Sequence, residues 1–414
     1  MPPRATAKKD AAPKKNGLQT PALPKGKPES LGFSSARLKN LSQTIGREVD
    51  KGTLPGAVVM IGRRGKVAHF DAIGRQGPDS DAKMRPDSVF RIFSMTKPIV
   101  SLGIMQLVED GLILINDPLS KYIPAFAKMQ VGVPREGKLH LVPAEREITI
   151  QDLLTHSGGL SYEITGPGPI QTLYAEAKLY RRNQTNEEHA NTVASLPLIS
   201  QPGTAWNYSR STDILGRVIE VVSGKTLMAY LTERILGPLR MTDTGFHIDA
   251  DRAEGRLAEP FPTDPWTGAK VVYFSMTDKP LFESGGGGMV STAPDYARFA
   301  QMLANGGSLD RERIIGRKTL ELMASNHLGP NVKVESHLMP PGHGFGLGFA
   351  VRTEAGLAPY PGSVGQYFWG GAAGTQFWVD PKENLWALLM VQAPGQREYI
   401  RVLFRNLVYA AIDS

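Results

Sequence analysis

Cysteine is absent from this chain of 414 residues. The protein therefore has no thiolate nucleophile, no disulfide framework and no cysteine-ligated zinc or iron–sulfur site. Its eight histidines lack H-E-x-x-H or any comparable metal-binding spacing, so we expect neither a metal nor another cofactor. If the protein is an enzyme that works through a covalent intermediate, serine is its natural nucleophile.

Long apolar runs are absent as well. No stretch approaches the ~20 apolar residues of a membrane helix. The basic residues near the N-terminus are not followed by the apolar run of roughly 7–15 residues that a secretory signal contains. We therefore expect a cytoplasmic protein that does not contact a membrane.

Positive charge is concentrated at one end of the chain. The formal net charge is +7, and residues 1–30 hold seven basic and two acidic side chains, which leaves a net +2 for everything after them. The same segment contains six prolines and few apolar residues, so we predict a disordered basic leader over 1–30. Because no aromatic residues are interleaved with its charges, we expect no nucleic-acid partner.

Apolar spacing predicts regular structure towards both ends of the remaining chain. Residues 33–51 show helical spacing, and strand-like runs at 56–62 and 66–74 flank the turn of a β-hairpin. Four further strand-like runs precede a closing helix near the other end, at 344–352, 362–370, 374–380, 385–392 and 397–412. Thr292 followed by Asp295 predicts a capping box at the start of another helix.

The middle of the chain differs from its ends. Residues 96–275 show mainly helical patterns separated by long loops rich in proline and glycine. We therefore predict an α+β fold: one antiparallel sheet built from both ends of the chain, helices on its faces, and an inserted, mainly helical domain. Residues 31–95 and 276–414 would form the α/β domain and residues 96–275 the helical domain, with the active site at their interface.

The first candidate for chemistry is Ser94-Met-Thr-Lys97. Residues i and i+3 are neighbours on a helix, so the lysine amine could take the serine proton. The spacing alone is weak, because Ser80 and Lys83 repeat it in a polar segment. A long apolar run follows Lys97, however, and Pro98 is tolerated only in the first turn of a helix. The helix should begin near Ser94, with the hydroxyl at the positive end of its dipole; the alternative is a surface capping serine.

Two further segments hold groups that could assist this serine. In Trp206-Asn-Tyr208-Ser-Arg210, the Tyr208 phenol could relay a proton, although such a tyrosine is more often an ordinary amphipathic surface residue. In Phe368-Trp369-Gly370-Gly371-Ala372, paired glycines allow close approach and an exposed N–H could stabilise an oxyanion. The alternative for this second segment is a β-bulge beside a core tryptophan.

Together these segments resemble the serine β-lactamase and penicillin-binding-protein superfamily, specifically the class C β-lactamases and family VIII carboxylesterases. The resemblance covers nearly all of residues 31–414 and includes further segments, namely Ile148–Leu160, Pro202–Ser209, Leu215–Gly224, Gly237–Phe246 and Gly285–Thr292. It implies a β-lactamase/transpeptidase-like fold, with Ser94 as the acyl-forming nucleophile, Lys97 as its proton acceptor and Tyr208 as the general acid/base. It also implies an oxyanion hole formed by the backbone N–H groups of Ser94 and Ala372.

A departure on the last motif indicates the branch. β-Lactamases and transpeptidases carry a Lys/His-Thr/Ser-Gly box whose cation and hydroxyl hold the substrate carboxylate, whereas this chain has Trp369-Gly370-Gly371. The exchange removes charge-assisted hydrogen bonds of about 1.5–3 kcal/mol each to an anionic substrate and supplies an apolar wall. Trp-Gly-Gly is what family VIII esterases show, which implies that these three residues contact the substrate.

The tyrosine segment departs too. Its usual third residue is asparagine, which would contact a substrate amide, and this chain has Arg210 instead. Arg210 would bind an acidic substrate or pair with a surface carboxylate. His156, within the Thr-His-Ser-Gly-Gly segment, is expected to make structural hydrogen bonds.

The resemblance thus implies a carboxylesterase that cleaves short- to medium-chain esters through an acyl-enzyme on Ser94, with a small-molecule ester as its partner. Alternatives on the same fold are an acyltransferase and a class C-type β-lactamase or D-amino peptidase. A non-catalytic penicillin-binding-like module is a further alternative. The sequence contains no G-x-S-x-G nucleophile elbow, which argues against an α/β-hydrolase.

Overall fold

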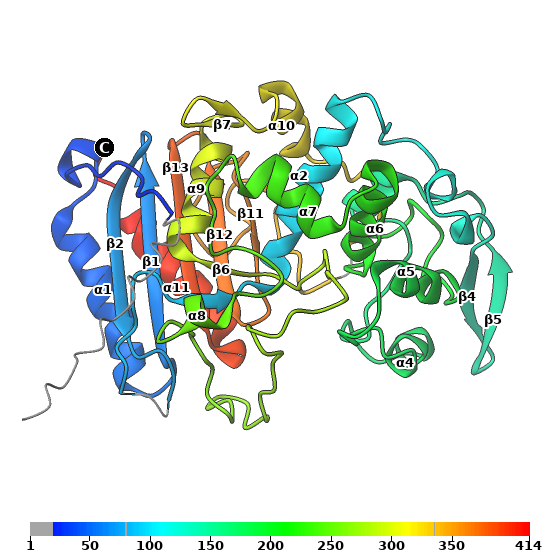
Figure 1. The fold of residues 1–414 in the computed structure, drawn as a ribbon, viewed down its shortest axis with the longest axis horizontal. Coiled ribbons are helices and arrows are strands. Elements are labelled where there is room, and N and C mark those ends of the chain that lie inside the picture. Colours follow the sequence, from blue (N-terminus) through cyan, green and yellow to red (C-terminus); the bar gives the residue numbers. More distant parts are fainter. Residues whose placement is uncertain (1–19, 79–80, 335) are drawn as a thin grey trace, which may run out of the picture.

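The computed structural model describes residues 20–78, 81–334 and 336–414 (Figure 1). A seven-stranded antiparallel sheet has the order β2-β1-β13-β12-β11-β10-β9. Its strands are β1 Gly56–Arg63, β2 Lys66–Gly74, β9 His343–Phe345, β10 Ala350–Arg352, β11 Tyr367–Gly370, β12 Gly374–Asp380 and β13 Leu385–Gln392. The first hairpin therefore pairs with the last strand, and Val58 of β1 faces Met390 of β13. This confirms the predicted α+β class and the sheet built from both ends of the chain.

Two layers of helices cover the sheet. On β12, the adjacent side chains of Phe377 and Trp378 point to opposite faces, as strand geometry requires. Phe377 packs 5.1 Å from Tyr296 of α9 (Ala293–Ala304), measured between ring centroids, and Trp378 packs 5.4 Å from Phe404 of α11 (Arg397–Ala410). Helix α1 (Ser35–Asp50) lies beside α11. The central strands β1 and β13 are consequently buried along their whole length.

A mainly helical region adjoins the sheet, with α4, α5 and the hairpin β4–β5 at the opposite end of the molecule from α1 (Figure 1). The helices are α2 Thr96–Glu109, α3 Ile150–Leu154, α4 Pro169–Glu176, α5 Asn186–Ala194, α6 Ser211–Ser223, α7 Leu227–Leu231 and α8 Ala250–Ala253. The hairpin, which apolar spacing did not reveal, is β4 Gln130–Arg135 with β5 Lys138–Pro143. Short pairs β3 Val89–Arg91 with β6 Val290–Thr292 and β7 Ser308–Leu309 with β8 Glu312–Arg313, and helix α10 Arg317–Met323, complete the elements.

Two predicted strands are shorter in the structure. Residues 344–352 form two strands separated by Gly346–Phe349, where Gly348 has a φ of +100°, a backbone conformation that favours glycine and ends a strand. Residues 362–366 precede β11 as irregular chain. At 345–349, Phe345, Leu347 and Phe349 predicted a continuous strand, because apolar composition does not distinguish a strand from a buried loop.

The predicted leader is wrong for residues 20–30. Leu23 is 6% exposed, the Gly26 N–H donates to the Val67 carbonyl at 3.0 Å, and the Val67 N–H donates to the Pro24 carbonyl at 2.8 Å. The segment thus uses unpaired backbone groups along the edge strand β2. The average composition of residues 1–30 did not predict this contact with β2, because one leucine and a few backbone hydrogen bonds are enough to make it. Residues 1–19 lie outside the described chain.

A buried carboxylate links this segment to helix α9. Thr292 caps α9 by accepting the Asp295 N–H, as predicted. The Asp295 carboxylate does not close the capping box. It accepts instead from the Asp243 N–H at 2.8 Å, from the Thr244 hydroxyl at 2.7 Å and from the Thr20 hydroxyl. Burial raises the pKa of Asp295 to about 6.

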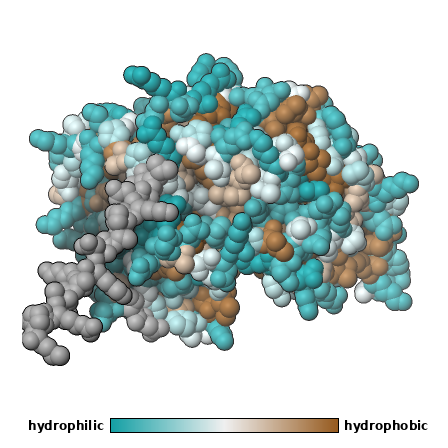
Figure 2. Space-filling view, viewed as in Figure 1, coloured by the Kyte–Doolittle hydropathy of each residue, from teal (hydrophilic) through white to brown (hydrophobic). Residues whose placement is uncertain are grey.

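Figure 2 shows hydrophilic residues over most of this face, with apolar residues in small separate groups. Within residues 20–78, 81–334 and 336–414, no helix combines the length and apolarity needed to span a bilayer.

We predict that Asp295→Asn removes part of the pH dependence of stability. The folded pKa lies above the unfolded value near 4, so the free energy of unfolding of the native protein, relative to the variant, should fall as pH rises from about 4 to about 6. Two pKa units correspond to roughly 2–3 kcal/mol. Urea denaturation of both proteins between pH 4 and 7 measures the difference, and a difference that stays constant across this range would contradict the assignment.

Candidate active site

Ser94 lies in a 3₁₀ turn, Phe93–Met95, that leads directly into α2. The α-helix begins at Thr96, two residues later than predicted, and Pro98 still falls within its first turn. Phe93 has a φ of +43°, which is unfavourable for a residue other than glycine. Its ring is held at 4.8 Å from Tyr273 and 5.7 Å from Phe274, centroid to centroid. Aromatic packing thus holds the sharp turn that presents Ser94.

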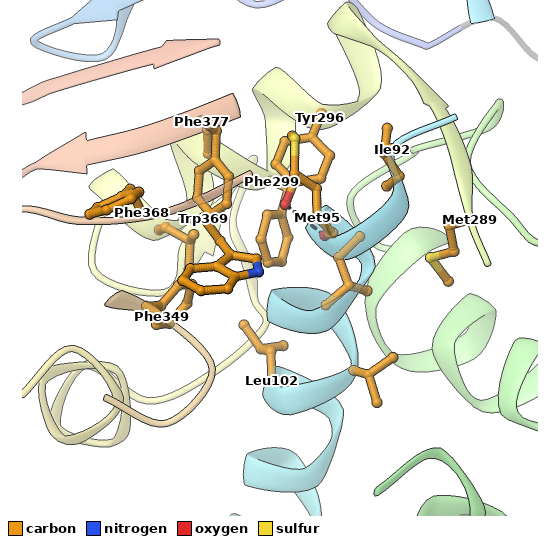
Figure 3. Packing of buried hydrophobic residues seen from close by; sticks show 14 of the residues in the cluster. Ile92, Met95, Leu102, Met289, Tyr296, Phe299, Phe349, Phe368, Trp369 and Phe377 are labelled. Atoms are coloured by element: carbon orange, nitrogen blue, oxygen red, sulfur yellow. Dashed lines mark hydrogen bonds between the residues drawn. The ribbon is translucent and has the colours of Figure 1, made fainter. Parts of the chain in front are cut away.

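The neighbouring residues anchor this turn in the core. The Tyr296 hydroxyl donates to the Met95 carbonyl at 2.9 Å. Figure 3 shows that hydrogen bond and, beside it, the Trp369 indole pointing towards the first turns of α2. The nucleophile candidate therefore stands on a rigid part of the structure.

Lys97 is 2% exposed and lies among three polar groups. Its Nζ is 3.5 Å from Ser94 Oγ, 3.2 Å from the Tyr162 hydroxyl and 2.6 Å from the Gly286 carbonyl oxygen. Nζ also lies 4.5 Å from the centre of the Tyr208 ring. The structure thus brings Tyr208, which is remote in sequence, next to the Ser94–Lys97 turn.

Tyr208 is held from two sides. The Trp369 indole donates from Nε1 to the Tyr208 hydroxyl oxygen at 3.3 Å. The His156 ring packs 4.9 Å from the Tyr208 ring, and His156 Nδ1 lies 3.2 Å from Ser209 Oγ. Burial lowers the pKa of His156 well below its usual value, so it is neutral at pH 7. His156 contacts Tyr208 and Ser209, in agreement with the structural role expected of it.

Gly370 and Gly371 lie at the corner between β11 and β12. A Cβ atom on Gly371 would lie 2.3 Å from Thr375 Oγ1 and 2.4 Å from the Ile92 carbonyl oxygen, so a larger residue does not fit. The Gly371 N–H donates to the Thr375 carbonyl at 2.8 Å, which leaves Ala372 as the next amide along the chain. A cavity of about 330 Å³ is lined by Ser94, Tyr208, Trp369, Gly370, Gly371 and Ala372.

Arg210 does not line this cavity. It is buried and pairs with Glu163 at 2.5 Å and with Asp213 at 3.6 Å, nitrogen to oxygen. Its placement as a substrate-binding residue is therefore corrected: of the two alternatives, pairing with a carboxylate is observed, although the carboxylates are interior ones. Sequence spacing could not show this, because Glu163 comes from a loop remote in sequence.

Sequence reasoning also missed the group that holds Lys97. Asp213 Oδ1 accepts from the Gly286 N–H at 2.9 Å and from the Ser284 hydroxyl at 2.6 Å. The Gly286 peptide then presents its carbonyl to Lys97. A Cβ on Gly286 would lie 2.6 Å from Asp213 Oδ2 and 2.8 Å from the Tyr162 hydroxyl. The run of four glycines, Gly285–Gly288, was the available signal, but a glycine run does not reveal which side chains approach it.

No cluster of three or more histidine, aspartate or glutamate side chains suited to a metal ion occurs in the described part of the chain. The residues that surround Ser94 are hydroxyl, amine, phenol and indole groups. Their arrangement can transfer protons between a serine, an amine and a phenol next to a cavity of a size that suits a small molecule.

Comparisons with known proteins give one consistent family. The β-lactamase family profile matches residues 41–411. Protein Rv1367c of Mycobacterium tuberculosis is 37% identical over 84% of this chain and 88% of its own length. Esterase EstB of Burkholderia gladioli is 28% identical over 92% of this chain and 98% of its own length. The solved structure of EstCE1, described as a hydrolase with promiscuous acyltransferase activity, superposes with a TM-score of 0.73 at 26% identity, over 91% of this chain and 98% of that one. The β-lactamase/transpeptidase-like fold is thereby confirmed.

We predict that Arg210→Met destabilises the protein by roughly 3–5 kcal/mol, because it leaves Glu163 and Asp213 as unpaired interior carboxylates. The matched control is Arg217→Met, on the helix α6 that Arg210 precedes; its ion pairs are partly exposed and should be worth at most about 1 kcal/mol. Urea denaturation measures both. Equal losses in the two variants would contradict the structural role of Arg210.

Proposed function

Because this chain belongs to the β-lactamase family, we propose that it is a serine hydrolase that cleaves short- to medium-chain carboxylic esters through an acyl-enzyme on Ser94. The observation that carries the proposal is the position of Lys97 Nζ, 3.5 Å from Ser94 Oγ beside a cavity that Tyr208 and Trp369 also line. The names of Esterase EstB and of the EstCE1 hydrolase support the reaction class, and their alignments cover most of this chain.

In the first step, Ser94 Oγ attacks the ester carbonyl carbon while its proton passes to Lys97 Nζ. A neutral amine has two N–H bonds and one lone pair. The Gly286 carbonyl and the Tyr162 hydroxyl oxygen can accept the two N–H groups, so the lone pair is left for the Ser94 proton. Burial raises the pKa of Tyr162 well above its usual value, so its phenol stays protonated and uncharged in this role.

The tetrahedral intermediate places a negative charge on the former carbonyl oxygen. We assign its stabilisation to the backbone N–H groups of Ser94 and Ala372, which belong to residues on the same cavity wall. The Gly371 N–H is already bonded to Thr375 and is not available for this purpose. Removing one fixed backbone donor of this kind costs about 2.7–4 kcal/mol of transition-state stabilisation.

Tyr208 then protonates the leaving group. An indole N–H is only a donor, so the hydrogen bond from Trp369 uses the oxygen of Tyr208 and leaves its hydroxyl proton free. That proton goes to the departing alkoxide as the carbon–oxygen bond breaks, and the Lys97 ammonium replaces it. Water attacks the acyl-enzyme in the second half, with its proton passing through Tyr208 to Lys97 and from there to the Ser94 oxygen as it leaves.

The wall formed by β11 favours esters over β-lactams. Where the superfamily's lactamases and transpeptidases carry a cation and a hydroxyl, this strand presents the buried Trp369 indole followed by two glycines. An indole gives apolar contact area to an acyl or alkoxy chain. It also bonds the catalytic phenol directly, so one residue serves both the pocket and the proton relay.

We predict that Ser94→Ala lowers kcat/KM for p-nitrophenyl butyrate by at least about a thousandfold and abolishes labelling by a fluorophosphonate probe. Lys97→Ala and Tyr208→Phe should each lower it by at least about a hundredfold, the usual size of general acid–base contributions. Ser80→Ala and Lys83→Ala provide a matched control, since they alter the other Ser–x–x–Lys spacing; Ser80 lies outside the described residues. Native turnover in all three active-site variants would refute the mechanism.

A second candidate is acyl transfer to an alcohol, which the description of EstCE1 favours. We predict hydrolysis to dominate in water, with transesterification appearing when 1-butanol is added at high concentration. Product analysis of p-nitrophenyl esters from acetate to laurate separates the two outcomes and defines chain length. Nitrocefin turnover faster than ester turnover would instead favour the β-lactamase reading.

A further inference from the structure

Helix α11 forms a cationic wall of the cavity that contains Ser94. Arg397, Arg401 and Arg405, spaced four residues apart on one face, all line the cavity. The only acidic residue among the described lining residues is Glu398, whose side chain is 71% exposed and which pairs with both Arg397 and Arg401. The cations therefore outnumber the carboxylates on this wall.

Arg405 is the unusual member of this wall. It is 1% exposed, and its Nε and both terminal nitrogens have no hydrogen-bond partner within residues 20–78, 81–334 and 336–414. Its guanidinium carbon lies 4.6 Å from the centre of the Tyr360 ring, 4.4 Å from that of Phe368 and 4.7 Å from that of Trp378. Ring faces stabilise the cation partly, but they leave all five of its N–H donors unused.

Arg401 stands one turn closer to the reacting groups. One terminal nitrogen donates to the Thr375 carbonyl at 3.1 Å and to the Gly371 carbonyl, so the guanidinium is fixed at the corner that precedes Ala372. Its Nε has no partner in the described part of the chain. Gln376, which lines the same cavity, likewise has an unpaired buried Oε1. Burial lowers the pKa of Arg401 to about 10, which still leaves it charged at pH 7.

Buried guanidinium groups are rarely left without an acceptor, because an arginine without one loses the hydration of all its donors. A carboxylate matches the arginine fork with two parallel hydrogen bonds. We infer that the cavity takes esters that carry a carboxylate elsewhere in the molecule, and that Arg405, with Arg401, binds this carboxylate. This inference rests on the proposed ester hydrolysis and names its substrate class.

The test compares each carboxylate ester with a neutral partner of similar size. Mono-p-nitrophenyl glutarate against p-nitrophenyl pentanoate places the charge on the acyl side. 4-Acetoxybenzoate against methyl 4-acetoxybenzoate places it on the alcohol side. In Arg405→Met, the ratio of kcat/KM for the charged ester to that for its neutral partner should fall about tenfold in one of the two pairs, the factor for one charge-assisted hydrogen bond. The pair that responds identifies the side.

Two controls accompany this variant. Arg405→Lys keeps the charge but not the fork and should lose less of the ratio. Arg313→Met removes one positive charge from a residue that does not line the cavity, and it should leave the ratio within twofold of the native value. Ratios in Arg405→Met within twofold of native for both ester pairs would overturn the inference.

A binding measurement separates this inference from the proposed function. Disodium glutarate should raise the Tm of the native protein more than glutaramide does, and Arg405→Met should abolish the difference. If no ester is hydrolysed and Ser94 is not labelled, but glutarate still stabilises the native protein through Arg405, the hydrolase proposal fails and the anion site stands. If Arg405→Met does not fold, the native protein decides: equal Tm shifts with glutarate and glutaramide overturn the anion site.

Discussion

The hydrogen bond from Lys97 Nζ to the Gly286 carbonyl is the interaction on which the site depends. An amine buried beside a serine is useful only if its N–H groups have acceptors and its lone pair has a direction. The Gly286 peptide supplies one acceptor, and its own N–H is fixed by Asp213, which Arg210 neutralises. One peptide unit therefore connects an internal ion pair to Lys97.

Several features of the fold could be predicted because they depend on local patterns. The first and last helices, the first hairpin and strands β12 and β13 could be predicted, because their apolar residues repeat with the period of a helix or a strand. The Thr292 cap was also predicted, but the partners of the Asp295 carboxylate were not, since they come from Thr20 and Asp243–Thr244. What the pattern could not reveal is contact between segments that are remote in sequence.

The residues of the site likewise divide into those that local sequence patterns predicted and those that only the folded chain brings together. Ser94 and Lys97 share one helical turn, so spacing and the position of Pro98 were enough to single them out. Tyr208 and the Trp369-Gly370-Gly371 strand required a resemblance, because only the folded chain brings them beside that turn. For Arg210 the sequence left two alternatives, an acidic substrate and a surface carboxylate, and the structure pairs it with interior carboxylates. The sequence did not indicate that the arginines of α11 line the cavity, because a helical arginine is ordinarily a solvated surface group.

The pairing of β1 with β13 has a consequence for how the protein is made. Val58 of β1 pairs with Met390 of β13, so the β1–β2 hairpin is synthesised long before its partner strand. The centre of the sheet cannot form until β13 has been made. Contacts between such distant residues slow folding, and an open apolar strand edge invites pairing with other chains in the meantime. Ser94 follows the hairpin in the sequence, whereas Trp369 and the α11 arginines that line its cavity come much later, so a nascent polypeptide has Ser94 without the cavity. The cavity beside Ser94 is thus completed only after α11 has been synthesised.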